Sequence, residues 1–155
     1  MSFLAGRYTA TLGASALGQT KDGFRVSHSS FEQPITGDAM AQTVQDAVHQ
    51  GAEMHVAFTG IEYNAAGMQN AFWPFSSTIY DMGVIGRLRS AIADSLVLTA
   101  VAGTPAAAAP ATATFLLTQL AAGFPVELLF ATALREVPLR FAVLPNSSGI
   151  LGSQT

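Results

Sequence analysis

The sequence predicts a mainly all-β protein, a β-sandwich or barrel with one or two short helices and long loops. Ser95 to Val126 is a run of 32 consecutive residues without a charged side chain. A run of about 20 apolar residues usually indicates a transmembrane helix. Here Gly103, Pro105 and Pro110 interrupt the run, and proline removes backbone donors that lipid cannot replace. We therefore expect several strands joined by turns, and no membrane-spanning segment.

Short alternating segments elsewhere support the same fold class. Charged residues make up 11% of the chain, against about 25% in a typical domain. A chain of 155 residues is expected to form a single domain, residues 1–155. Strands with so few charged residues predict that much of the surface of the subunit is buried in contacts. The expected partner in these contacts is another copy of the chain.

The first strands are predicted within residues 7–35. Tyr8 and Leu12 fall on one side of an alternating segment, so residues 1–20 are assigned to an N-terminal arm and a first strand. Residues 13–22 are small and polar, which indicates a loop or arm. Phe24 and Val26 share a face of a second strand. Residues 31–35 would continue it after a bend, with Pro34 confining that part to a sheet edge or a bulge.

The segment from Asp38 to Gly51 fits two structures. Asp38 could cap a helix that ends at Gly51, or short extended pieces could lie around Val44 and Val48. Residues 53–59 follow as the clearest strand in the sequence, because Met54, Val56 and Phe58 alternate with polar or small residues.

The remaining elements are predicted in chain order. Residues 64–94 form a long loop that contains a short helix at 64–71, the aromatic cluster Phe72-Trp73-Pro74-Phe75, and a helical turn through Leu88 and Ile92. Strands are expected at 96–102, 111–120 and 126–134, with a hairpin tip at 103–110. In the last strand Val137, Leu139, Phe141 and Val143 point inward, and residues 146–155 are expected to be a loose C-terminal tail.

No set of residues predicts catalysis, a cofactor or a metal. The chain has no cysteine, no G-x-S-x-G nucleophile motif and no phosphate-binding glycine loop. An enzyme acting through Asp46, His49 and Glu53 would require these side chains to form a cluster, and the sequence does not support such a cluster. A net charge of −3 without a basic cluster disfavours binding to a phosphate backbone. The protein is therefore expected not to be an enzyme.

Several segments, taken in order, carry a resemblance. They are Gly18-Gln19-Thr20, Asp22-Gly23-Phe24, Gly37-Asp38 with Val44, Asp46, Val48 and Gly51, Glu62-Tyr63-Asn64-Ala65-Ala66-Gly67, Phe72-Trp73-Pro74, Leu98-Thr99-Ala100, Gly103-Thr104-Pro105-Ala106, Gly123-Phe124-Pro125-Val126, Leu129-Phe130, and Leu134-Arg135-Glu136-Val137-Pro138-Leu139-Arg140. Their order and spacing, from about residue 5 to residue 145, resemble a family of bacteriophage tail tube proteins (major tail proteins).

The resemblance implies a tail-tube fold whose subunits join into six-membered rings. Such rings stack into a hollow tube through which DNA passes into the host. The partners it implies are other copies of the chain, a tape-measure protein, a tail terminator and a baseplate or tip, with a sheath if the tail contracts. It places the protein in the virion after assembly in the host cytoplasm.

Two sets of residues are predicted to serve the tube. A lumen for DNA should not attract phosphate, so some of the carboxylates Asp22, Glu32, Glu53, Glu62 and Glu127 are expected to line it. Long loops and aromatic residues are expected to make contacts between subunits or rings. These candidates are Phe3, Leu4, Tyr8, Phe72, Trp73, Phe75, Arg87 and Arg89.

Two other functions remain open on the sequence. A head–tail joining or tail terminator protein would form one ring without growing into a tube. A small β-barrel could instead hold an apolar ligand inside a closed sheet. Tube proteins of bacterial secretion machines are physically similar to phage tail tube proteins, and the sequence alone separates the two poorly.

Overall fold

The computed structural model describes residues 7–38, 43–62, 86, 88–101, 110–127 and 136–155. Within them the chain is mainly β, as the sequence predicts. The elements are β1 (Tyr8–Leu12), β2 (Ser15–Ala16), β3 (Thr20–Thr36), β4 (Val44–Gly60), the 3-10 helix η2 (Arg89–Ala91), β5 (Asp94–Ala100), β6 (Thr112–Leu120), β7 (Val137–Leu144) and β8 (Gly152–Gln154).

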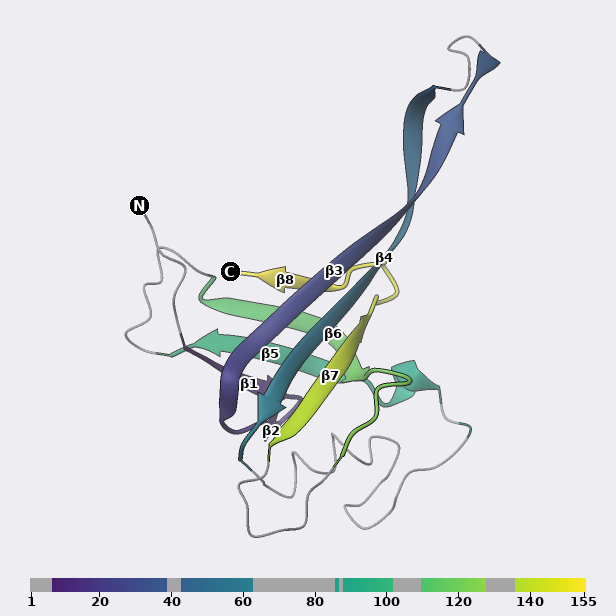
Figure 1. The fold of residues 1–155 in the computed structure, drawn as a ribbon. Helices are drawn as coiled ribbons and strands as arrows, with labels where there is room; N and C mark the ends of the chain where they lie inside the picture. Colours follow the sequence, from purple (N-terminus) through teal and green to yellow (C-terminus); the bar gives the residue numbers. More distant parts are fainter. Residues whose placement is uncertain (1–6, 39–42, 63–85, 87, 102–109, 128–135) are drawn as a thin grey trace.

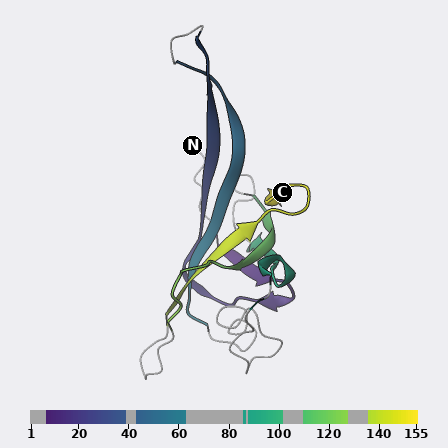
Figure 2. The same cartoon turned by 90° about the vertical axis from the view of Figure 1, so that its right-hand side faces the viewer.

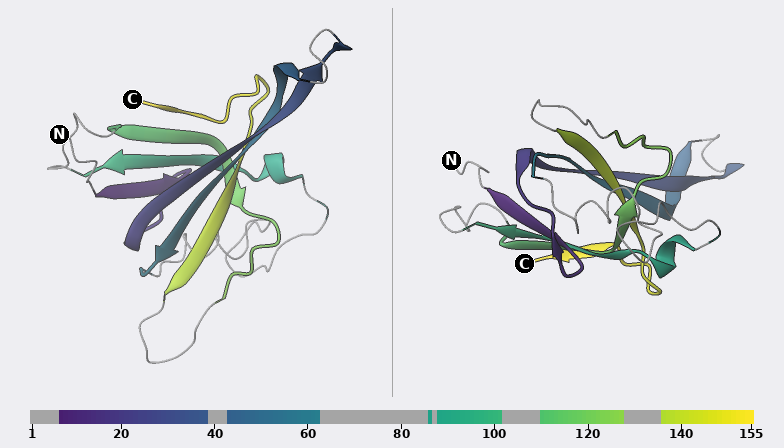
Figure 3. Two further views of the ribbon diagram at one scale, coloured as in Figure 1. Left: turned by 45° about the horizontal axis from the view of Figure 1, so that its top comes forward. Right: turned by 90° about the horizontal axis from the view of Figure 1, so that it is seen from below.

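The described strands form one antiparallel sheet that doubles over on itself. Its order is β2-β1-β5-β6-β7-β4-β3, and β8 pairs with β6 as well. The start of β6 pairs with β8 and its end pairs with β7, so the sheet changes direction at β6. Strands β1, β5, β6 and β8 make a first layer, and β7, β4 and β3 cross over it as a second (Figure 1; Figure 3).

The core lies between these two layers. Alternation places every second side chain of a strand on the inner side. The first layer contributes Ala10, Leu12, Leu96, Leu98 and Phe115, and the second contributes Val56, Phe58, Leu139, Phe141 and Val143. The rings of Phe58 and Phe141 lie 5.5 Å apart, and Phe24 lies 5.1 Å from Phe58. The alternation predicted for β7 and for the second half of β4 is confirmed.

A long β3–β4 hairpin extends beyond the two layers (Figure 1; Figure 2). Strand β7 pairs with β4 only from Met54 to Gly60. Beyond that point β3 and β4 pair only with each other, from Ser29 opposite Glu53 to Thr36 opposite Val44. We call residues 29–36 and 44–53 the distal ribbon.

The structure resolves one ambiguity and corrects two predictions. Residues 44–51 are strand, not helix. The expected arm is in part a sheet edge, because β2 pairs with β1 and Leu17 is buried. Residues 146–155 are not loose. Asn146 Oδ1 accepts hydrogen bonds from the backbone N–H groups of Ser148 and Ile150, both 2.9 Å, and this turn directs β8 onto β6.

Other predictions have mixed outcomes. The helical turn near residues 88–92 is confirmed as η2, and Pro34 lies on the edge strand β3 as expected. Val126 and Glu127 are not in a strand, and the rest of the strand expected at 126–134 lies outside the described residues. So do the helix expected at 64–71, the aromatic cluster at 72–75 and most of the 103–110 tip.

Candidate assembly surface

The outer side of the second layer is a polar face built by strand register. Directly opposed residues of an antiparallel pair share a face. One row runs Arg25–Ala57–Arg140 across β3, β4 and β7, and the next runs Ser27–His55–Ala142. Ser29 lies opposite Glu53 beyond these rows. We define the polar face by these residues: Arg25, Ser27, Ser29, Glu53, His55, Ala57, Arg140 and Ala142.

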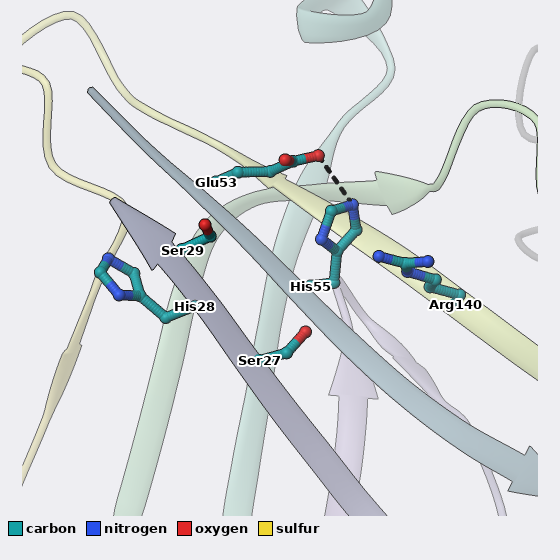
Figure 4. A pocket seen from close by; sticks show the side chains of 6 residues that line it. All are labelled: Ser27, His28, Ser29, Glu53, His55 and Arg140. Atoms are coloured by element: carbon teal, nitrogen blue, oxygen red, sulfur yellow. Dashed lines mark ion pairs between the residues drawn. The ribbon is translucent and has the colours of Figure 1, made fainter. Parts of the chain in front are cut away.

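A shallow hollow of about 150 Å³ lies on the polar face. Ser27, Ser29, Glu53, His55 and Arg140 surround it, and His28, which also borders it, points away from them in Figure 4. Glu53 Oε1 lies 3.4 Å from His55 Nε2, so protonated His55 would form an ion pair there. The hollow is open and the side chains that border it belong to polar residues, which suits a charged or hydrogen-bonding group from outside.

Two arginines flank Ala57 on this face. Arg25 and Arg140 are both exposed. Neither side chain makes a hydrogen bond or ion pair within the part of the chain that the structure describes. A guanidinium group recognises carboxylate or phosphate oxygens through paired N–H donors. The row Arg25–Ala57–Arg140 therefore presents unused donors on either side of a small residue.

The distal ribbon has exposed apolar side chains. Phe31 is 51% exposed, Val48 52% and Ile35 44%. Register places Val48 opposite Gln33, between Phe31 and Ile35 along β3, so the three apolar side chains share one face. Asp46, directly opposite Ile35, lies on that face as well. We call this side, with Phe31, Ile35, Val48 and Asp46, the ribbon's apolar face.

On the outer side of the first layer, two described rows of opposed residues contain no charged side chain. Thr9, Thr99 and Thr112 are opposed in one row across β1, β5 and β6, and Thr112 exchanges backbone hydrogen bonds of 3.0 and 2.9 Å with Thr155. The adjacent row contains Thr11, Val97, Thr114 and Ser153. This threonine face is a second low-charge surface available for contact.

The carboxylates predicted to line a lumen do not gather at one place. Glu32 is opposite His49 in the distal ribbon, and Glu53 is on the other face of the same ribbon. Glu62 lies past the far end of β4, where its Oε2 accepts a 3.0 Å hydrogen bond from the N–H of Gln19. Asp22 and Glu127 are exposed at further sites. A common lumen for these residues stays a prediction.

The predicted contact residues are only partly described. Phe3, Leu4, Phe72, Trp73, Phe75 and Arg87 lie outside the described residues. Tyr8 donates from its hydroxyl to the carbonyl of Pro110 (2.8 Å) and packs against the core. Arg89 Nη2 donates to the carbonyl of Leu120 (2.9 Å). Both side chains thus have partners inside the subunit, and their role between subunits stays a prediction.

Sequence reasoning missed the apolar face of the distal ribbon, although a signal for it exists. Residues 26–86 contain no lysine or arginine, yet six of the ten acidic residues fall there. An acidic segment without lysine or arginine that also contains Phe31, Ile35 and Val48 favours a surface with a cationic partner.

The described residues contain no group of three or more histidine, cysteine or acidic side chains placed to hold a metal ion. Asp46 and His49 are on opposite faces of the ribbon, Asp46 opposite Ile35 and His49 opposite Glu32, so the structure does not bring these two side chains together. Among the described residues, no helix has the length and apolar character needed to cross a membrane. No protein-family model and no curated protein matches the sequence.

Proposed function

We propose that this protein is a structural subunit that assembles with copies of itself into rings, and that the rings stack into the hollow tube of a bacteriophage tail. The distal ribbon is the observation that carries the proposal. The order and spacing of the sequence segments that resemble tail tube proteins support the same function. DNA would pass through the tube without sequence-specific contacts.

The distal ribbon needs a partner on physical grounds. A two-stranded hairpin on its own is marginally stable in water. This one has strand edges that pair with nothing in the described subunit, and it exposes Phe31, Ile35 and Val48. Exposed edges and apolar side chains together favour association. Assembly would cover both, and the threonine face would provide further low-charge contact area.

In this proposal the remaining partners follow from the tube. A tape-measure protein would occupy the growing tube, a terminator would stop it near the head, and a baseplate or tip would start it. A contractile tail would add a sheath. The subunit would be made in the host cytoplasm and end in the virion.

A head–tail joining or terminator protein would associate with copies of itself in the same way. It differs because it forms a single ring that does not extend into a tube. The ligand-binding alternative has less support within the part of the chain that the structure describes, where the hollow on the polar face is open and lined by polar side chains. An apolar ligand requires an enclosed, mostly apolar site. Electron microscopy of concentrated protein distinguishes tubes, single rings and separate subunits.

Removing the distal ribbon tests the proposal. Ser30 and Ala52 are directly opposed, so residues 31–51 can be replaced by an Asn-Gly turn between them. We expect the shortened chain to fold, because the core lies outside the ribbon, and to remain a monomer at concentrations at which the full chain forms rings or tubes.

Light scattering and electron microscopy measure the outcome, and circular dichroism checks the fold. His49→Gln, a polar change on the other face of the same ribbon, serves as the control and should assemble normally. Normal tubes from the shortened chain would contradict the role given to the ribbon. A full-length chain that stays monomeric at millimolar concentration would contradict the proposed function itself.

A further inference from the structure

We infer that the distal ribbon of one copy docks on the polar face of a second copy, with Asp46 of the ribbon on the Arg25–Ala57–Arg140 row. This inference rests on the proposed function, because it specifies the contact by which copies associate. It commits to another copy of this chain as the occupant of the polar face.

Charge is segregated along the chain in the way this contact requires. All seven lysine and arginine residues fall outside residues 26–86. The distal ribbon carries carboxylates and no lysine or arginine. The polar face carries two exposed arginines without partners in the described chain, and its one carboxylate, Glu53, lies where this face meets the ribbon. Complementary charges on two surfaces orient their approach and select one register of contact.

Side-chain size is also complementary. The polar face has small residues beside its arginines, namely Ser27, Ala57 and Ala142. The ribbon's apolar face presents the larger Phe31, Ile35 and Val48. Large side chains can lie over small ones, and the aliphatic parts of Arg25 and Arg140 can cover the apolar atoms at the rim. The shallow hollow between these strands provides additional room.

Asp46 is available for this contact. Its carboxylate accepts a 2.8 Å hydrogen bond from the N–H of Ala47, the next residue, and is otherwise exposed on the ribbon's apolar face. Bidentate pairing of a carboxylate with arginine is among the stronger polar contacts. A carboxylate placed between Arg25 and Arg140 could use donors from either of them.

One chain cannot make this contact with itself. Arg25 and Ile35 are on the same strand and ten residues apart, a separation of about 33 Å in an extended chain. The ribbon of one copy must therefore lie on the face of another. Repeated head-to-tail, such a contact closes into a ring if the rotation permits and otherwise continues as a filament.

Charge reversal in trans tests the contact. We expect Asp46→Lys to raise the concentration needed for assembly by about tenfold, because it places a cation against two arginines. The double variant Arg25→Glu with Arg140→Glu should be impaired similarly. An equimolar mixture of the two variants should assemble again, because each ribbon then meets a face of opposite charge.

Glu32→Lys is the matched control. It makes the same charge change on the same ribbon, but Glu32 lies on the opposite face. It should assemble nearly as the unmodified chain does. Sedimentation of each variant and of the mixture, over a concentration series at low and high salt, measures the effect. Assembly of the unmodified chain should weaken with salt, because exposed charges are screened.

The outcomes separate this inference from the proposed function. Tubes formed at normal concentration by Asp46→Lys or by the arginine variant would overturn the contact and leave the tube intact. Failure of the mixture to assemble would also overturn it. If the arginine variant assembles normally but its tubes no longer retain short duplex DNA, the arginines face nucleic acid and the inference is wrong. If the mixture of the two variants forms only dimers, the copies associate as a symmetric pair and the head-to-tail contact is wrong.

Discussion

Phe141 occupies the point at which the sheet turns from one layer to the other. It is fully buried, opposed by Leu120 of β6 on one side and by Val56 of β4 on the other. Its ring also lies 5.5 Å from that of Phe58. One side chain therefore contacts the strands that connect the two layers.

Phe141→Ala should lower the free energy of unfolding by about 3–5 kcal/mol, through lost burial and the cavity that remains. Urea unfolding at a protein concentration too low for assembly measures the change. Thr11→Ala, on the exposed threonine face, should change it by less than about 0.5 kcal/mol. Similar values for the two variants would show that the core does not centre on Phe141.

Lys21 and Glu136 form an exposed ion pair between the start of β3 and the residue before β7, with Nζ and Oε1 2.8 Å apart. The hydrogen bond that Lys21 donates to Glu136, together with the negative charge of Glu136, raises the pKa of Lys21 above its ordinary value of 10.5. Because the folded pKa exceeds the unfolded one, the stabilisation is complete below pH 10.5 and is lost as the pH rises through the folded pKa.

Lys21→Met should therefore be slightly less stable than the unmodified chain at neutral pH, since exposed pairs contribute little. The difference should shrink as the pH rises above 10.5 and through the folded pKa of Lys21, because the lysine then loses its charge. Urea midpoints of both chains at neutral pH and at a series of pH values above 10.5 measure this. A difference that persists unchanged at the higher pH would assign the effect to the lost side-chain packing.

At the scale of elements, β8 shows how a short polar strand can complete a sheet. Its pairing with β6 uses backbone hydrogen bonds, and Leu151 just before it packs against the core. Gly-Ser-Gln has no apolar alternation, so the sequence offers no strand signal there. Strands with one buried face, such as Val137–Leu144, are predictable because alternation records the burial.

Deleting residues 151–155 should lower the free energy of unfolding by about 2 kcal/mol or more, because backbone pairing and the burial of Leu151 are lost together. Ser148→Ala is the control: the N–H of Ser148, rather than its hydroxyl, makes the hydrogen bond to Asn146. Thermal unfolding of both variants against the unmodified chain measures the effect. If the deletion leaves the thermal midpoint unchanged, these residues do not stabilise the fold, as expected for the loose tail that the sequence predicts.

The distal ribbon explains why residues 38–51 stayed ambiguous between helix and strand. Every residue from Val44 to Gln50 is exposed, and so is every residue from Ser29 to Thr36. With solvent on both faces, the apolar pattern carries no period that separates strand from helix. Which face of the ribbon must be apolar would depend on the surface of a partner, and the sequence pattern of one subunit does not record that surface.

At the scale of the whole molecule, the fold class and most strands were predictable, while the strand order was not. Alternation indicates that Tyr8–Leu12 is a strand, but nothing local shows that it pairs with Asp94–Ala100. The candidate site was less predictable. Carboxylates such as Glu32 and Glu53 were chosen by charge alone, and the register that puts them on opposite faces depends on pairing across the hairpin.

The pairing of β1 with β5 also bears on how the chain folds during synthesis. The β3–β4 hairpin joins neighbouring segments and can form as soon as residue 60 has left the ribosome. The two layers cannot close until β5, β6 and β7 exist, and such non-local pairings form slowly. A nascent chain therefore exposes the apolar side chains of its hairpin before its core can form. When several ribosomes translate the same mRNA, neighbouring nascent chains could then associate through these hairpins before they have folded.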